Sequence, residues 1–286
     1  MIGSDAFAIA ADDELPALTP RQEREFAYHR ARAATLDGLA EKPVATDVLS
    51  EVRRRPWNAY WSLYDRIIAA SPAGKRVLVP GSGFGDDAIR LALLGARVSA
   101  FDLSPESVAI ARERAERAGC EIDFRVAPAE ALAAYDDGTF DMVVFVDILH
   151  HVEIAATLRE VVRVTRDGGL VLGDELYTHS LLQRVRESVP IARVAYPLLR
   201  RWIYGRGEPY ITPDEHKIDE AELALVLGAL EAPQLEWFGL VEGRLFPSRM
   251  VWASRVDRAA MRIAGRAAAR LASRVVFSGT IRASAV

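Results

Sequence analysis

The chain has 286 residues, a formal net charge of −4, 50% hydrophobic and 27% charged residues, and one cysteine. This composition supplies the core of one large α/β domain or two small ones, and its charge gives no reason to expect a nucleic acid partner. One cysteine excludes an internal disulfide or a multi-cysteine metal site, and without a signal peptide pattern or a membrane-spanning run we expect a cytoplasmic protein.

The N-terminal part of the chain divides into an arm and a helical cap. Residues 1–20 are acidic and contain alanine and proline, which predicts a flexible arm. Residues 21–72 have helical spacing, with a break near Lys42–Pro43. The second helix places Trp57, Tyr60, Trp61 and Tyr64 on one face. This aromatic stripe either packs against a sheet or forms a lid over a site.

Strand and helix signals alternate over residues 73–176. Short apolar runs predict strands at 75–80, 96–102, 121–127, 140–147 and 169–176, with helices at 86–94, 104–118 and 153–165. Strands separated by helices indicate an α/β fold with a doubly wound, mostly parallel sheet. The run FDMVVFVD is apolar almost throughout, as expected for a strand that is covered on both faces.

The pattern changes after the fifth strand. Residues 177–234 read as a helical insert, with helices at 179–205 and 219–231 and a Gly/Pro-rich loop at 206–217 between them. Residues 235–286 add strands at 235–243 and 274–281, with a long helix at 254–273. These two strands complete a seven-stranded sheet.

The stretch VLVPGSGFGDD carries a glycine turn between the first strand and the first helix of this sheet. Gly81, Gly83 and Gly85 let the backbone approach a ligand closely and aim a helix N-terminus at it. Asp102 ends the next strand, where it would accept hydrogen bonds from ribose hydroxyls. The dinucleotide fingerprint is G-x-G-x-x-G/A, and Asp86 stands at the position of its last glycine or alanine. The carboxylate would there repel the pyrophosphate of a dinucleotide. A nicotinamide-dependent oxidoreductase is therefore disfavoured.

These residues, followed by PAEALAAYDDGTFDMVVFVDILHHV and RDGGLVLGDEL, resemble the class I S-adenosylmethionine-dependent methyltransferases, and more narrowly a bacterial small-molecule subgroup. The resemblance runs from about Trp57 to Ile281 and implies a Rossmann-like fold over residues 73–176 and S-adenosylmethionine as cofactor. Val79 and Pro128 depart from the family, which usually has acids there. The residues that the resemblance assigns to the cofactor are Gly81, Ser82, Gly83, Gly85, Asp86, Asp102, Leu103, Ala129, Glu130, Asp147, Ile148, Tyr60 and Tyr64.

Polar residues that follow the fourth and fifth strands would serve the methyl acceptor. Open α/β sheets bind ligands at the carboxyl ends of their strands, and a histidine there can act as a base near neutral pH. The resemblance implies that the insert shapes the acceptor pocket as a lid. The expected acceptor residues are His150, His151, Glu175, Tyr177, His179 and His216. A metal site formed by Asp174, His179, Asp214 and His216 is the less favoured alternative, so we predict no metal.

The sequence thus predicts a small-molecule methyltransferase, most readily an O-methyltransferase acting on a natural product, sugar or lipid-like acceptor. N- or C-methylation on the same fold is the first alternative, and a non-catalytic cofactor-binding or assembly module is the second. The helix 254–273 also carries a basic stripe, which is either a solvated face or a surface for weak association with an anionic membrane. Its arginines are Arg255, Arg258, Arg262, Arg266, Arg270 and Arg274.

Overall fold

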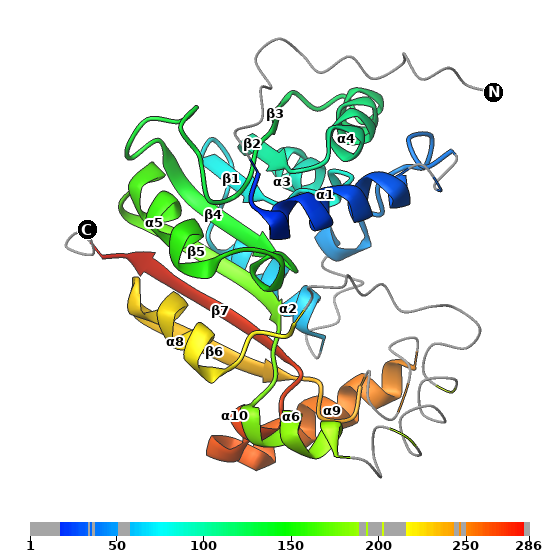
Figure 1. Cartoon of the computed structure of the whole chain (residues 1–286), viewed down its shortest axis with the longest axis vertical. Helices are drawn as coiled ribbons and strands as arrows, with labels where there is room; N and C mark the ends of the chain where they lie inside the picture. The colour runs from blue at the N-terminus through cyan, green and yellow to red at the C-terminus, as the bar shows by residue number, and fades with distance from the viewer. Residues whose placement is uncertain are drawn as a thin grey trace.

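The computed structural model describes residues 18–33, 35, 38–50, 58–188, 193, 202, 216–242, 246 and 250–282. Its centre is a seven-stranded sheet in the order β3-β2-β1-β4-β5-β7-β6 (Figure 1). Strands β1 to β5 run parallel, whereas β7 is antiparallel to both of its neighbours, β5 and β6. The predicted mostly parallel, seven-stranded sheet is confirmed. The strands are β1 (Arg76–Pro80), β2 (Arg97–Asp102), β3 (Ile122–Val126), β4 (Phe140–Val146), β5 (Thr165–Leu176), β6 (Leu230–Phe238) and β7 (Arg274–Ile281).

Helices cover both faces of the sheet. The reason is visible in β1, where apolar side chains point alternately to the two faces and both faces must be buried. Val77 and Val79 belong to one apolar core and Leu78, between them, belongs to the other. The first core packs under α2 (Ala59–Ala69), α3 (Asp86–Leu93) and α4 (Pro105–Arg117), and the second under α5 (Ile154–Val164) and α8 (Glu220–Gly228). The other helices among the described residues are α1 (Pro20–Ala33), α6 (Ser180–Glu187), α9 (Val251–Ala264), α10 (Ala268–Leu271) and the 3-10 turns Asp47–Leu49, Leu149–His151 and Gly265–Ala267.

Three predicted elements differ from the structure. Strand β6 begins at Leu230 rather than at 235, and it tolerates Pro233 because it is an edge strand whose register shifts between Glu231 and Gln234. The predicted helix 254–273 is interrupted at Gly265, where φ is +51°. Strand β5 starts at Thr165, with a register shift against β4 before Leu170.

Part of the predicted organisation lies outside the described residues. The arm is described only from residue 18, and Trp57 and Asp214 are not described. Of the predicted helix 179–205, α6 accounts for Ser180–Glu187, and most of the remainder of the insert up to residue 215 is not described. In the described part of the chain, no helix is both long and apolar enough to span a membrane.

Candidate functional site

The glycine turn after β1 is built from three residues with positive φ. Gly81, Gly83 and Gly85 have φ values of +61°, +51° and +83°, which glycine adopts without strain. A Cβ atom on Gly81 would lie 2.3 Å from Ile148 Cδ1, and one on Gly85 would lie 2.9 Å from Ala111 Cβ. A Cβ on Gly83 would meet nothing within 4 Å. Two of the glycines therefore allow close packing, while the third leaves the backbone open to a ligand.

Asp102 at the end of β2 is held by this turn. Its Oδ2 accepts a hydrogen bond from the Gly83 N–H at 2.8 Å, and its Oδ1 accepts one from the Ser104 N–H at 2.9 Å. These bonds fix the carboxylate, and each oxygen keeps a further lone pair for a ribose hydroxyl. Nearby, the buried hydroxyl of Ser82 has no hydrogen-bond partner among the described residues. The turn thus offers acceptors and a donor to a nucleoside.

A cavity of about 260 Å³ lies beside the turn, at the carboxyl ends of the parallel strands. It brings together eight residues that were assigned to the cofactor: Gly81, Gly83, Asp102, Leu103, Ala129, Glu130, Asp147 and Ile148. The other lining residues are Gln22, Glu25, His29, Phe84, Phe101, Ser107, Ala127, Pro128, His151 and Val152. A pocket at this edge of an open α/β sheet is where such folds bind ligands.

Tyr60 and Tyr64 do not line this pocket, contrary to the expectation that they reach the cofactor. Both hydroxyls donate to Asp87 Oδ1, at 2.5 and 2.6 Å, and Arg90 Nη1 donates to the Tyr60 hydroxyl at 2.5 Å. Burial and the Asp87 charge raise the pKa of both tyrosines, so both stay protonated. Tyr64 lies in the core next to α3, and Tyr60 and Trp61 pack against the same core, as the packing alternative predicts for these three residues.

Asp86, which was expected to contact the cofactor, is instead paired with an arginine outside the pocket. Arg114 of α4 donates to both of its carboxylate oxygens, at 2.7 and 3.1 Å, and Asp86 is not among the pocket residues. Gly85 precedes it as the N-cap of α3, turned toward α4. Val79, where the family usually has an acid, is 2% exposed in the apolar core. An apolar side chain fits that core position better than an unpaired acid would.

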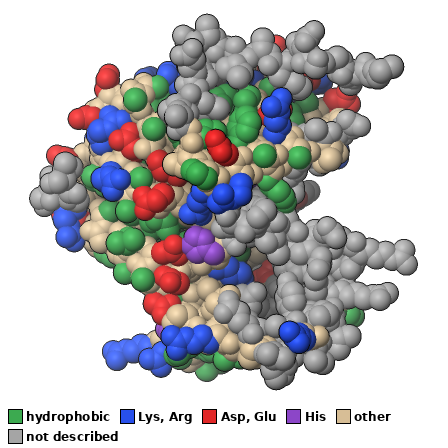
Figure 2. All heavy atoms as spheres, in the orientation of Figure 1, with side chains coloured by type: hydrophobic (Ala, Val, Ile, Leu, Met, Phe, Trp, Pro, Cys, Tyr) green, Lys and Arg blue, Asp and Glu red, His purple; other side chains and the backbone are tan. Residues whose placement is uncertain are grey.

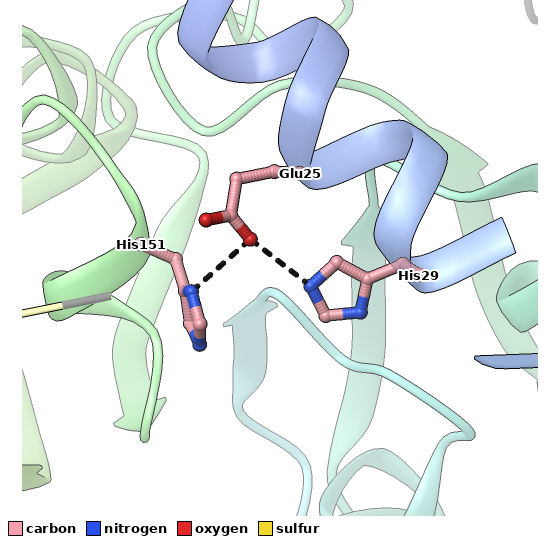
Figure 3. Close-up of side chains that lie close together, drawn as sticks. All are labelled: Glu25, His29 and His151. Atoms are coloured by element: carbon pink, nitrogen blue, oxygen red, sulfur yellow. Dashed lines mark ion pairs between the residues drawn. The ribbon is translucent and has the colours of Figure 1, made fainter. Parts of the chain in front are cut away.

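Two histidines and a glutamate meet at the pocket, from distant parts of the chain. Glu25 and His29 come from α1, and His151 comes from the 3-10 turn after β4 (Figure 3). Oε2 of Glu25 lies 3.3 Å from His151 Nδ1 and 3.5 Å from His29 Nε2. We call these three residues the His–Glu cluster. Glu25 is only 4% exposed, so its charge lies in a region where water screens little.

Side-chain contacts hold α1 over the pocket. Arg21 Nη2 donates to the His150 carbonyl at 3.1 Å, and Gln22 Nε2 donates to Glu130 Oε2 at 2.9 Å. Arg30 forms an ion pair with Glu106 at 2.8 Å. Glu25 and His29 were not identified as site residues from the sequence, because the sequence of a helix does not show which part of the fold it packs against. Their i, i+4 spacing, which places them on one helical face, is the signal that could have singled them out.

Glu175 and His150 form a buried pair beneath the turn that carries His151. Glu175 accepts hydrogen bonds from the N–H groups of Ile148 at 3.0 Å and Leu149 at 2.7 Å, and it also bonds His150 Nδ1. Burial opposes ionisation of Glu175, but His150 and the backbone donors outweigh it and hold its pKa below the ordinary value. The pair fixes the backbone that presents His151 to the pocket.

Three further acceptor candidates lie elsewhere. Tyr177 is buried against Trp237 at a ring distance of 5.0 Å, and burial raises its pKa to about 12. His179 caps α6, where its Nδ1 accepts from the Leu181 N–H at 3.2 Å. His216 is exposed and lies 2.7 Å from Glu222. Of the six predicted acceptor residues, all of them described, His151 is the one that lines the pocket.

The disfavoured metal grouping does not come together among the described residues. Asp174 is fully buried and accepts from Arg274 Nε at 3.0 Å, while His216 pairs with Glu222. Asp214 lies outside the described residues. The guanidinium of Arg274 already balances the negative charge of the Asp174 carboxylate, which a bound metal ion would otherwise have to do.

The chain matches known methyltransferases. A family model described as a methyltransferase domain matches residues 78–173. The ubiquinone biosynthesis O-methyltransferase of Methylocella silvestris is 31% identical over 201 residues, which cover 70% of this chain and 74% of that relative. The enzyme of the same name from Xanthomonas axonopodis is 41% identical over 99 residues, 34% of this chain and 41% of that relative.

Solved structures share the fold. The geranyl diphosphate C-methyltransferase of Streptomyces coelicolor superposes with a TM-score of 0.55 at 15% identity, over 93% of this chain and all of the other (100%). The magnesium protoporphyrin IX methyltransferase of Synechocystis gives 0.54 at 13% identity, over 92% of this chain and 100% of the other.

The pocket fits the cofactor of these relatives. The open backbone at Gly83 and the fixed carboxylate of Asp102 suit a nucleoside that carries an amino acid and no phosphate, whereas Ser82 does not line the pocket. The protein is thus a transferase that acts on a small molecule. It belongs to the class I S-adenosylmethionine-dependent methyltransferases, with S-adenosylmethionine as its methyl donor.

Proposed function

We propose that the chain methylates an oxygen atom of a small acceptor, and that the acceptor oxygen belongs to a phenol-like hydroxyl. The observation that carries this proposal is the His–Glu cluster at the cofactor pocket. Similarity to ubiquinone biosynthesis O-methyltransferases supports an oxygen acceptor. An imidazole with a pKa near 6.5 can help remove a proton from a phenol with a pKa near 10, whereas an aliphatic alcohol is far less acidic. A natural product with such a hydroxyl fits these requirements.

In this proposal the glycine turn and the strand ends hold the cofactor. Asp102 accepts the ribose hydroxyls, and Leu103 and Ala129 flank the adenine. Asp147, a non-glycine residue with φ of +49°, faces the methionine amino group. Backbone strain of this kind is often stored at ligand sites. Because Asp86, Tyr60 and Tyr64 have partners outside the pocket, the methionine end falls to the backbone of the turn and to Asp147. Oδ1 of Asp147 pairs with Arg274, so Oδ2 is the oxygen that would accept from the methionine amino group.

The residues of the His–Glu cluster then act on the acceptor. The cofactor supplies an electrophilic methyl group on a sulfonium, so the protein mainly has to align the hydroxyl oxygen, exclude water and weaken the hold on its proton. His151 and His29 are the groups that can draw this proton, and Glu25 orients both imidazoles. Glu175 and His150 keep the turn of His151 in place as positioning residues.

The test is turnover of a panel of phenols, aliphatic alcohols and amines with isotopically labelled cofactor, with the product analysed for O-, N- or C-methylation. We expect phenols to be methylated on oxygen. Glu25→Gln and His151→Asn should lower kcat about 10²- to 10⁴-fold and leave the Kd for S-adenosylhomocysteine within about twofold. Glu23→Gln makes the same chemical change at an exposed position of α1 and should keep full activity.

Different outcomes would overturn separate parts of this proposal. Product methylated on nitrogen or carbon would refute the oxygen acceptor. Unchanged kcat in Glu25→Gln would refute the role of the cluster. Cofactor binding without any turnover across the panel would favour a non-catalytic module.

We also propose that one face of α9 and α10 associates with an anionic membrane surface. Trp252, Val256 and Ile263 are 53%, 49% and 88% exposed, and exposed arginines alternate with them: Arg255, Arg262, Arg266 and Arg270. Figure 2 shows basic side chains gathered at the end of the molecule where these helices lie. Such mixed faces bind anionic lipid surfaces. Arg258 and Arg274 do not belong to this face, since they pair with Glu236 and with Asp147 and Asp174.

Co-sedimentation with vesicles tests this second proposal. Vesicles of phosphatidylglycerol and phosphatidylcholine should bind the protein, and pure phosphatidylcholine should not. The double variant Arg262→Glu/Arg266→Glu should lose at least tenfold in partitioning. Arg97→Glu, an exposed position at the start of β2, is the control. Equal binding to neutral vesicles, or no binding at low salt, would refute the docking surface.

A further inference from the structure

We infer that Glu25, His29 and His151 form a binding site for one divalent ion of the zinc class. The three side chains offer two imidazole nitrogens and one carboxylate oxygen, and these donor atoms all lie within 4.8 Å of one another. Two imidazoles and a carboxylate are a ligand set that zinc uses in catalytic sites. The inference deepens the proposed function, on which its catalytic part rests.

The two distances from the Glu25 oxygen fit a tetrahedral ion, and the two histidine nitrogens lie within 4.8 Å of each other. Zinc bonds of about 2.0–2.1 Å at tetrahedral angles place neighbouring donor atoms about 3.3–3.4 Å apart. Here the Glu25 oxygen lies 3.3 Å from the His151 nitrogen and 3.5 Å from the His29 nitrogen. An octahedral magnesium ion with bonds of about 2.1 Å would draw adjacent ligands to about 3.0 Å, and it prefers oxygen donors. Both the spacing and the donor atoms therefore favour zinc.

Burial and charge support the same assignment. Glu25 is 4% exposed and the side chain of His151 is 9% exposed, and a buried carboxylate is stabilised when it is paired or coordinates a metal. Figure 3 shows the Glu25 carboxylate between two imidazole rings, that of His29 on the same helix and that of His151 on the turn after β4. Since all three line the pocket, the fourth ligand of a tetrahedral ion would come from the pocket itself. Structural zinc sites are closed by four protein ligands, whereas the described residues supply three here.

A second group of similar composition does not fit a metal. Asp147, His150 and Glu175 also bring their donor atoms within 4.8 Å of one another. However, Glu175 is occupied by backbone N–H donors and by His150, and Asp147 pairs with Arg274 Nη2 at 2.6 Å. A guanidinium so close would repel a cation. The inference is therefore confined to the His–Glu cluster.

The ion would give the cluster a defined chemical role. A hydroxyl that binds a zinc ion loses its proton far more readily than the free hydroxyl, as zinc-bound water does. The acceptor oxygen at the fourth position would be held as an anion. With the ion bound, the facing nitrogens of His29 and His151 would be its ligands, so the released proton would pass to solvent and not to these histidines. The cluster would then select acceptors whose hydroxyl can reach the ion.

Metal binding is measured on the full chain without cofactor or acceptor, so the result is independent of turnover. After treatment with a chelator and dialysis, titration with zinc chloride should show one ion per chain, and cobalt(II) should give the intense visible bands of a tetrahedral site. Glu25→Gln and His29→Asn should each weaken zinc binding at least tenfold. Glu23→Gln and Cys120→Ser, which removes the only thiol of the sequence, should bind as the parent does.

Three results would overturn the inference: no stoichiometric zinc, binding that survives His29→Asn, or binding that is lost in Cys120→Ser. The chelated protein separates this inference from the proposed function. If the metal-free protein methylates phenols at the full rate while Glu25→Gln remains slow, the catalytic role of the ion is refuted and the proposed function stands.

Discussion

Gly81 packs so closely against Ile148 that a Cβ atom on the glycine would lie 2.3 Å from Ile148 Cδ1. The two residues belong to different strand ends, after β1 and after β4, and both line the cofactor pocket. The contact therefore sets how wide the pocket is between these strands.

Gly81→Ala should weaken cofactor binding. The alanine would have to adopt a φ near +61° and displace Ile148, and strain of this kind costs about 1–3 kcal/mol. We expect a roughly 5- to 150-fold higher Kd for S-adenosylhomocysteine in isothermal titration calorimetry. Gly74→Ala is the matched control, since Gly74 has φ of +75° but nothing within 4 Å of a Cβ. If both variants bind equally, the contact with Ile148 is unimportant for the cofactor.

Asp102→Asn should also weaken cofactor binding, by a different route. An amide can accept on one side only, so it loses either the Gly83 N–H or a ribose hydroxyl, at a cost of about 1–3 kcal/mol. Calorimetry should show the loss for S-adenosylhomocysteine. Asp123→Asn, at an exposed position of the neighbouring strand β3, serves as the comparison and should bind normally. An unchanged Kd in Asp102→Asn would remove the ribose assignment.

Glu175→Gln should destabilise the fold and change its acid response. Removing one member of a buried ion pair costs about 3 kcal/mol. Because the folded-state pKa of Glu175 is lowered, its contribution is fully present above the unfolded value of about 4.3 and is lost as the pH falls through the lower folded value. The difference in unfolding free energy between parent and variant should therefore shrink from pH 7 toward pH 3.

Urea unfolding at several pH values measures this difference. Glu121→Gln, at an exposed position before β3, should show no comparable loss at pH 7. A parent–variant difference that stays constant down to pH 3 would contradict the assigned direction of the pKa shift.

Asp257→Ala should destabilise the C-terminal part of the sheet without affecting the cofactor. This buried carboxylate in α9 accepts from the N–H groups of Gly239 at 2.8 Å and Glu242 at 3.1 Å, and also from that of Val241. Leaving buried donors unpaired costs about 1–3 kcal/mol each. The melting temperature should fall while the Kd for S-adenosylhomocysteine stays the same. Asp136→Ala, at an exposed position, is the control, and an equal shift there would exclude a specific role for Asp257.

The fold could be predicted from local signals, but much of the site could not. The apolar runs and the glycine turn predict strands close to their observed positions, because such patterns are formed by residues that are neighbours in the sequence. The partners of Asp86, Tyr60 and Tyr64 depend on helices that pack from elsewhere in the chain. His151 meets Glu25 across more than a hundred residues of sequence, and no periodicity encodes such a contact. The predicted bases His179 and His216 were placed by order along the chain, which does not determine distance to the pocket.

The division of the pocket between α1 and the sheet has a consequence for how such an enzyme can diverge. The ribose carboxylate and the glycine turn are anchored in strands, where a change of register would disturb the entire core. Glu25 and His29 belong to a helix attached through side chains such as Arg21, Gln22 and Arg30. Substitutions in this helix can therefore accumulate under selection for new acceptors, while the donor half of the reaction is inherited unchanged.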